Sequence, residues 1–139
     1  MPITMNWYPS AFDGMFKGVI KQGDTFKVAL LTSAGTFDAA HDEWADVSSA
    51  EASGTNYVQK TLVITSALDS VVTPTRTEFT IPQARWGNLT CTFRNAVVFD
   101  DTSTGDKLLM HLDLGEDYVI VANDFQLNAP DPKPAIDPA

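Results

Sequence analysis

The chain has 139 residues, 44% hydrophobic and 19% charged, so it can bury the core of one domain without a disulfide or metal. Its 18 acidic residues outnumber its 9 basic residues and give a formal charge of −9. This charge argues against binding to nucleic acid or to an anionic membrane surface, because both need clustered lysine and arginine. The composition is also unlike that of a disordered protein.

Residues 6–22 carry the one convincing helical pattern in the chain. Apolar residues recur there at helical spacing, which predicts an amphipathic helix. These residues are Tyr8, Ala11, Phe12, Met15, Phe16, Val19 and Ile20. Ser10 is a candidate N-cap and Gly23 a candidate stop. Because an isolated helix of this length is not stable in water, we expect it to pack on its own domain or on a partner.

From residue 24 onward the pattern changes to that of strands. The clearest alternation places Leu89, Cys91 and Phe93 on one face, and residues 100–106 have the composition of a hairpin loop. A short helical segment is expected around residues 42–47. Strands are expected at residues 26–31, 57–64, 77–81, 89–99, 107–114, 118–122 and 124–127. About seven strands separated by frequent turn signals predict a mainly β fold, an antiparallel β-sandwich or barrel-like domain.

The C-terminal segment holds half of the prolines and cannot form a central strand or a helix. Its prolines include Pro130, Pro132 and Pro134. We therefore expect a single β-rich domain over residues 1–127 and an extended Pro-rich arm over residues 128–139. We expect this arm to become ordered only on assembly with a neighbouring subunit.

No catalytic motif with specific spacing is present. The chain lacks a Gly-rich phosphate loop and a Gly-x-Ser-x-Gly elbow. A Ser/His/Asp triad could be assembled on paper from His41 or His111, but a triad is defined by geometry and the chain is rich in Ser and Asp. We predict a protein that is not an enzyme and that needs no cofactor. The N-terminus also lacks the pattern of a secretory signal, and no apolar run is long enough to span a membrane.

Two acidic loops are the candidates for metal binding. Their residues are Asp38, His41, Asp42, Glu43 and Asp46 in one loop and Asp100, Asp101 and Asp106 in the other. Neither loop matches the calcium-loop pattern, and the single cysteine, Cys91, excludes a zinc site built on cysteines. We interpret both loops as solvated turns and predict no metal site, with weak calcium binding as the alternative.

The three tryptophans allow two interpretations. Trp44 and Trp86 fit core positions, but either could also form a stacking platform for a cell-surface glycan. Trp7 lies beside Tyr8 near the chain end, where a partner subunit could cover both. The sequence alone does not choose between these roles.

Two groups of motifs occur in a fixed order along the chain. The first group is a short amphipathic helix, a strand ending in Leu-Leu-Thr-Ser, a His/Trp/Asp-Val segment at 41–47 and the run Ser-Gly-Thr-Asn-Tyr at 53–57. The second group lies at residues 86–90, 94–101 and 108–117. Taken together, they resemble a family of small virion structural proteins of tailed bacteriophages. The chain departs from the family at Val58, Gln59 and Lys60, where relatives are Gly-rich, and in its Pro-rich arm.

The resemblance implies a non-enzymatic virion protein located on the outer capsid surface and made in the host cytoplasm. The expected function is capsid decoration: many copies bind the head shell and stabilise it. The expected partners are the major capsid protein and further copies of this chain, for which a trimer is one arrangement. The alternatives are a head-fibre, neck, collar or tail component and a glycan-binding β-sandwich. The candidate interface residues are Trp7, Tyr8, Phe12, Met15, Phe16, Trp44, Trp86, Pro130, Pro132 and Pro134.

Overall fold

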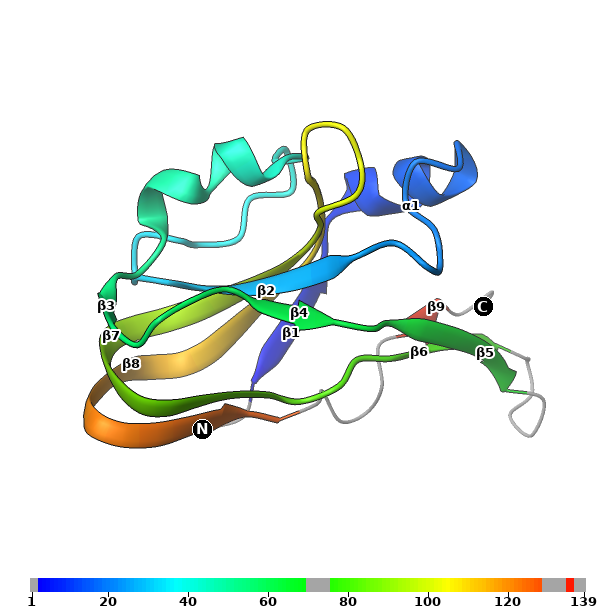
Figure 1. Cartoon of the computed structure of the whole chain (residues 1–139). Coiled ribbons are helices and arrows are strands. Elements are labelled where there is room, and N and C mark those ends of the chain that lie inside the picture. Colours follow the sequence, from blue (N-terminus) through cyan, green and yellow to red (C-terminus); the bar gives the residue numbers. More distant parts are fainter. Residues whose placement is uncertain (1–2, 70–75, 129–134, 137–139) are drawn as a thin grey trace.

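The computed structural model describes residues 3–69, 76–128 and 135–136, and its fold is mainly β (Figure 1). A six-stranded antiparallel sheet has the order β1-β8-β7-β2-β4, with β3 also paired to β7, and a smaller sheet has the order β5-β6-β9. The elements are β1 Thr4–Trp7, α1 Pro9–Phe16, β2 Phe26–Leu31, the 3-10 helices η1 Trp44–Asp46 and η2 Ser48–Ala50, β3 Gly54–Thr55, β4 Lys60–Leu62, β5 Thr65–Asp69, β6 Arg76–Thr80, β7 Ala84–Asp100, β8 Lys107–Leu127 and β9 Ala135–Ile136. The predicted antiparallel, mainly β fold with an N-terminal helix is confirmed.

The hairpin of β7 and β8 organises the molecule. The half of each strand next to the loop at 101–106 pairs within the six-stranded sheet, and the other halves bend back under it as a two-stranded ribbon (Figure 1). The register shifts between Phe93 and Asn95, and Gly115 has a φ of +89°. Bulges of this kind bend a strand pair. The breaks that the sequence predicts after residues 114 and 122 are therefore irregularities within one long strand.

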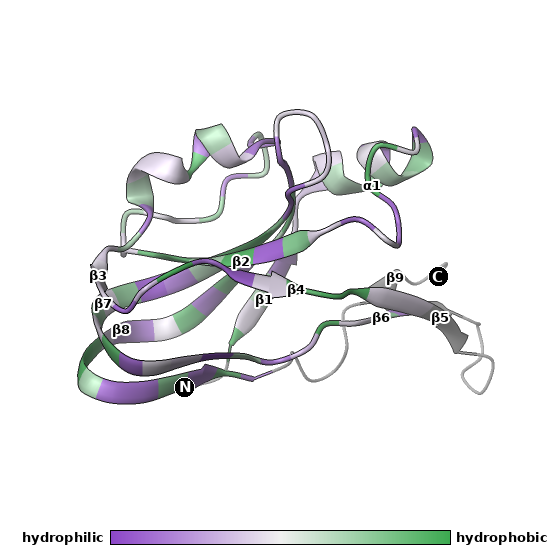
Figure 2. Cartoon of the chain, in the orientation of Figure 1, coloured by the Kyte–Doolittle hydropathy of each residue, from purple (hydrophilic) through white to green (hydrophobic). Residues whose placement is uncertain are grey.

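The part of the six-stranded sheet formed by β2 and the loop-proximal halves of β7 and β8 is buried on both faces. On one face, Val28, Leu30 and Val98 pack against side chains of the curled ribbon, among them Trp86 and Phe93. On the other face, apolar residues pack under the segment at 33–53. These residues are Ala29, Leu31, Val97, Phe99 and Leu108, with Tyr8, Val47, Phe37 and Trp44 above them. Figure 2 shows the matching alternation of apolar and polar residues along β7 and β8.

A β-bulge places the Leu108 side chain on the opposite face of the sheet from the one that the sequence predicts. Along the strand at 107–114, simple alternation places Leu108, Met110 and Leu112 on one face. In the structure, Phe99 pairs with Leu108 and Val98 with Met110, so Leu109 is an extra residue. Leu108 therefore lies in the cluster under the segment at 33–53, whereas Met110 and Leu112 lie in the other cluster. The extra residue changes which face each side chain reaches.

The predicted helix at 6–22 is much shorter in the structure. Residues 4–7 form β1 on the edge of β8, and α1 covers only Pro9–Phe16. Its N-cap is Tyr8 followed by Pro9, and Ser10 lies inside the helix. After Phe16 the chain turns back through Gly18, whose φ is +74°. That conformation is costly for other residues, so the helix ends there and not at Gly23.

Other predicted elements differ mainly in length. The strand predicted at 57–64 is only β4 in the structure, and the helical segment predicted at 42–47 is the pair of 3-10 helices. The prolines at 130, 132 and 134 lie outside the described residues, while Ala135–Ile136 of the predicted arm pair with β6 as β9. Within the described ranges, no helix is long and apolar enough to cross a membrane.

The run at 51–57 closes the open side of β2. The Tyr57 hydroxyl accepts a hydrogen bond from the Leu30 N–H at 3.0 Å and donates one to Glu51 at 2.7 Å. The Ala52 N–H donates to the Leu30 carbonyl at 2.8 Å. β4 pairs with β2 only up to Val28, so these contacts satisfy backbone groups that β4 does not reach.

We expect Gly54→Ala to lower the free energy of unfolding by about 1–3 kcal/mol, because a Cβ at this position would collide with the Thr90 carbonyl. Urea unfolding measures the change. Gly87→Ala is the matched control, since the nearest atom to its Cβ would lie 3.8 Å away. Equal stability of the two variants would contradict the close approach of β3 to β7.

Candidate interaction surface

An exposed apolar surface surrounds the end of α1. The side chains of Phe16, Phe12 and Val19 are 93%, 40% and 36% exposed. We call these three residues the α1 patch. Exposed large apolar residues that lie next to one another are typical of surfaces that another molecule covers. Phe12 and Phe16 are two of the predicted interface residues.

The turn after α1 explains why Phe16 points outward. The N–H groups of Val19 and Ile20 both donate to the Gly14 carbonyl, at 2.8 and 3.2 Å. Ile20 thereby packs on Gly14, where an added Cβ would lie 2.9 Å from the Ile20 Cδ1. Ile20 takes the core position that a longer helix would also offer to Phe16, which stays in solvent.

Aromatic rings connect the α1 patch to the sheets. Trp7 contacts Phe12 and Phe79, with ring centroids 5.4 and 5.2 Å apart. Trp7 is half-buried, and its indole N–H is buried without an acceptor in the part of the chain that the structure describes. The sequence offered no signal for Phe79, because only the tertiary structure brings β6 beside β1.

A pocket of about 220 Å³ lies beside Met15 of α1 and the turn that follows the helix. It lies between α1, the loop after α1, β5 and β6. Its apolar lining consists of Met15, Ile20, Phe26, Ile64, Phe79 and Leu109. Met15 was predicted as an interface residue from its place in the apolar stripe, and among the described residues it is the only predicted interface residue in this lining.

The charges near the patch balance. Asp13 and Lys17 form an ion pair at 2.9 Å, and the Lys21 N–H donates to the Asp24 carboxylate at 3.2 Å. These two acids and two bases are the charged residues of segment 9–24, which is therefore neutral in a chain of charge −9.

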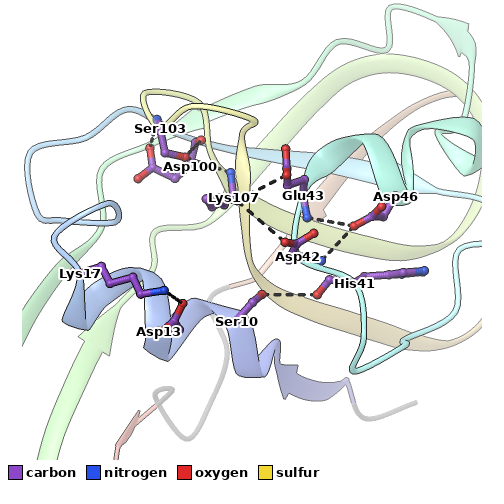
Figure 3. A network of polar contacts seen from close by, with 10 residues as sticks. All are labelled: Ser10, Asp13, Lys17, His41, Asp42, Glu43, Asp46, Asp100, Ser103 and Lys107. Atoms are coloured by element: carbon purple, nitrogen blue, oxygen red, sulfur yellow. Dashed lines mark hydrogen bonds and ion pairs between the residues drawn. The ribbon is translucent and has the colours of Figure 1, made fainter.

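Figure 3 shows the hydrogen bonds and ion pairs made by the acidic side chains of the first loop. Lys107 lies between Asp42 and Glu43, with N–O distances of 3.9 and 3.5 Å. The Asp46 carboxylate accepts the N–H groups of Asp42 and Glu43, which hold the pKa of Asp46 below its usual range. Among the described residues, no three His, Cys, Asp or Glu side chains are placed to hold a metal ion.

The Asp100 carboxyl is buried beside the half-buried Asp24. The Asp100 side chain is fully buried, and its Oδ1 accepts the Thr102 N–H at 2.9 Å. Its Oδ2 meets no N–H or O–H donor within the described ranges. Burial and the neighbouring Asp24 carboxyl raise the pKa of Asp100 to about 7. Sequence analysis placed Asp100 in a solvated turn and did not identify the partner, Asp24.

The remaining predicted interface residues lie elsewhere. Tyr8 and Trp86 are fully buried, so the structure places their side chains in the core. Trp44 is half-buried and stacks on Phe99 with ring centroids 4.8 Å apart. The three arm prolines lie outside the described residues.

The two histidines lie in different surroundings. The His111 ring is buried and contacts the Gly35 carbonyl through Nε2 at 2.8 Å, and burial lowers its pKa. The His41 ring lies 3.8 Å from Asp38 at the surface. Across residues 3–69 and 76–128, no serine hydroxyl bonds either ring.

Comparisons of the chain with models of protein families, with curated proteins and with solved structures find no match.

Proposed function

We propose that this chain is a non-enzymatic structural protein of a tailed-phage virion that decorates the capsid. Many copies bind the outer head shell, contact the major capsid protein and one another, and stabilise the shell. The motif resemblance described above is the source of the virion assignment. The proposed location is the outer capsid surface of the virion, after synthesis in the host cytoplasm.

The observation that carries this proposal is the exposed α1 patch on a domain whose main sheet is covered on both faces. Such a domain is stiff and needs no partner to complete its core, while Phe16 is left exposed for another subunit. A shell protein must also stay soluble at high local concentration, and a charge of −9 supports this through mutual repulsion.

The burial of Trp86 weakens the glycan-binding alternative. Its indole N–H donates to the Val58 carbonyl at 2.7 Å, and its ring packs between Tyr57 and Phe125. A sugar cannot stack on a ring that solvent does not reach. Trp44 presents only part of its ring, because Phe99 covers one face.

Counting copies in purified particles tests the proposal. Calibrated mass spectrometry compares this chain with the major capsid protein in the phage that encodes it. We expect hundreds of copies per particle, and we expect particles lacking the protein to lose DNA at a lower temperature and to be restored by adding it back. A few to a few dozen copies would place it in the neck, tail or fibres instead, and its absence would overturn the virion assignment.

A further inference from the structure

We propose that the Asp100 carboxyl and its neighbour Asp24 form a pH-sensitive switch at the loop end of β2 and β7. While Asp100 holds its proton, the connection at residues 24–25 stays bonded to the hairpin loop at 101–106. When Asp100 is charged, this connection separates from the loop and the rest of the domain stays folded. The inference concerns a local movement and does not depend on the proposed role in a virion.

The two oxygens of the Asp100 carboxyl have different surroundings. The residue is fully buried, and Oδ1 accepts the N–H groups of Thr102 and Ser103 at 2.9 and 3.3 Å. Oδ2 is buried as well, but no N–H or O–H group in the described part of the chain donates to it. A carboxylate needs donors or water around both oxygens, so a negative charge on Asp100 is poorly stabilised on the Oδ2 side.

Asp24 is the charged residue that opposes ionisation of Asp100. It is half-buried and lies on the connection between α1 and β2. Burial and the Asp24 carboxyl together raise the pKa of Asp100 to about 7. The proton on Asp100 therefore leaves close to neutral pH, and its departure places a second negative charge beside Asp24.

The cations near this loop are paired with other carboxylates. These ion pairs are Lys27–Asp101 at 3.3 Å, Lys107–Asp42 at 3.9 Å and Lys107–Glu43 at 3.5 Å. Asp106, in the same loop, adds a further carboxyl group, and the charges of Asp101 and Glu43 raise its pKa. Over the described ranges, no Lys, Arg or His side chain forms an ion pair with Asp24 or Asp100. A charge on Asp100 is therefore not neutralised by a side-chain cation.

Two hydrogen bonds of Thr25 hold the connection to the loop. The Thr25 N–H donates to Thr102 Oγ1 at 2.7 Å, and the Asp101 N–H donates to the Thr25 carbonyl at 2.8 Å. Both bonds lie just beyond Phe26 and Asp100, the last residue pair between β2 and β7 at this end. Residues 24–25 and 101–102 belong to neither core cluster. These bonds can therefore open locally without disrupting the core.

Movement of the connection relieves the charge on Oδ2. As residues 24–25 move away, water reaches Oδ2 and the two carboxylates separate. Oδ1 keeps the N–H groups of Thr102 and Ser103, because these lie in its own loop and bind a charged carboxylate more strongly than a neutral one. Gly23 precedes the moving residues with a φ of +99° and open space around its Cα, so the chain can pivot there.

Amide hydrogen exchange of the full chain, followed by NMR from pH 5 to pH 8, tests the proposal. We expect the protection factors of the Thr25 and Asp101 N–H groups to fall by up to about 100-fold, because Asp100 titrates near pH 7 when buried and near pH 4 when solvated. The protection factors of Thr102 and Ser103 should change less than about threefold. This contrast separates local opening from global unfolding, which would lower all four together.

Variants assign the pH dependence to the carboxyl group. In Asp100→Asn, the protection factors of Thr25 and Asp101 should no longer depend on pH. Asp106→Asn is the matched control, because it removes the same charge from the same loop and asparagine accepts the φ of +53° at this position. It should keep the wild-type dependence. If Asp100→Asn is misfolded by circular dichroism, Asp24→Asn replaces it, and the fall should shrink from about 100-fold to less than about tenfold.

Three results would overturn the switch. The first is a protection factor of Thr25 and Asp101 that does not change with pH in the wild type. The second is a fall that Thr102, Ser103 and the core amides of β7 share, since that would be global unfolding. The third is an Asp100→Asn variant that keeps the wild-type pH dependence.

Discussion

Asp100→Asn is expected to raise the free energy of unfolding by about 2–4 kcal/mol at pH 8 and to change it little at pH 4. The wild-type Asp100 is fully buried next to Asp24, and its pKa is raised from 3.8 to about 7. At pH 8 the folded protein must therefore hold a charged Asp100 carboxylate in a buried position beside Asp24. Asparagine keeps an oxygen for the Thr102 N–H and can donate its NH₂ group to Asp24.

The sign of the pH dependence follows from the raised pKa. The folded protein holds the Asp100 proton up to about pH 7, while the unfolded chain releases it near pH 4. The stabilisation from this proton is thus complete below pH 4 and is lost as the pH rises through 7. His111 acts in the opposite direction, because burial lowers its pKa. Its contribution is present above pH 6.5 and is lost as the pH falls through its lowered pKa.

Urea unfolding of the wild type and of Asp100→Asn from pH 4 to pH 8 makes the comparison, since the His111 contribution cancels in the difference. Asp101→Asn is the matched control, because it removes the same charge from the next residue. Asp101 is only partly buried and lies 3.3 Å from Lys27, so we expect a change of less than about 1 kcal/mol. A constant difference between the Asp100 variant and the wild type at all pH values would contradict the raised pKa of Asp100.

Trp86→Ala is expected to cost about 3–5 kcal/mol of unfolding free energy, a large share of the stability of a domain of this size. The Trp86 ring is fully buried between Tyr57 and Phe125. Its removal leaves a cavity in the core under the curled ribbon, and it leaves the Val58 carbonyl without its hydrogen bond.

Trp44→Ala is the comparison variant, because Trp44 is a half-buried tryptophan at the edge of the core, whereas Trp86 lies inside it. Trp44 is half-buried and stacks on Phe99, so we expect its loss to cost about 1–2 kcal/mol. Urea unfolding followed by far-UV circular dichroism measures both variants. If Trp86→Ala were no more costly than Trp44→Ala, the ribbon would not pack on the sheet as described.

The fold class could be predicted from local pattern because strand periodicity reports which side chains share a face. The alternation of Leu89, Cys91 and Phe93 predicted one buried face, and all three are buried. The hairpin loop after Asp100 was also recognisable, since turn residues are set by backbone geometry over a few positions. These features depend on neighbours in sequence.

The candidate site could be predicted only in part. The apolar stripe pointed to Phe12, Met15 and Phe16, but it also grouped them with Tyr8 and Ile20, which are buried. Helical spacing shows that residues share a face and does not show where the helix ends. The helix cannot begin before residue 8 because residues 4–7 pair with β8 as a strand, and it ends at Phe16 because the chain turns back at Gly18.

The sequence by itself determined an acidic, mainly β chain with an N-terminal apolar helix and a long final hairpin. Only the tertiary structure decided that Trp86 is core, that Asp24 lies beside Asp100, and that a pocket lies beside Met15. The reason is physical: periodicity follows from backbone geometry over a few residues. Burial and pKa instead depend on which distant segments cover a side chain, and here the bulges of β7 and β8 determine that.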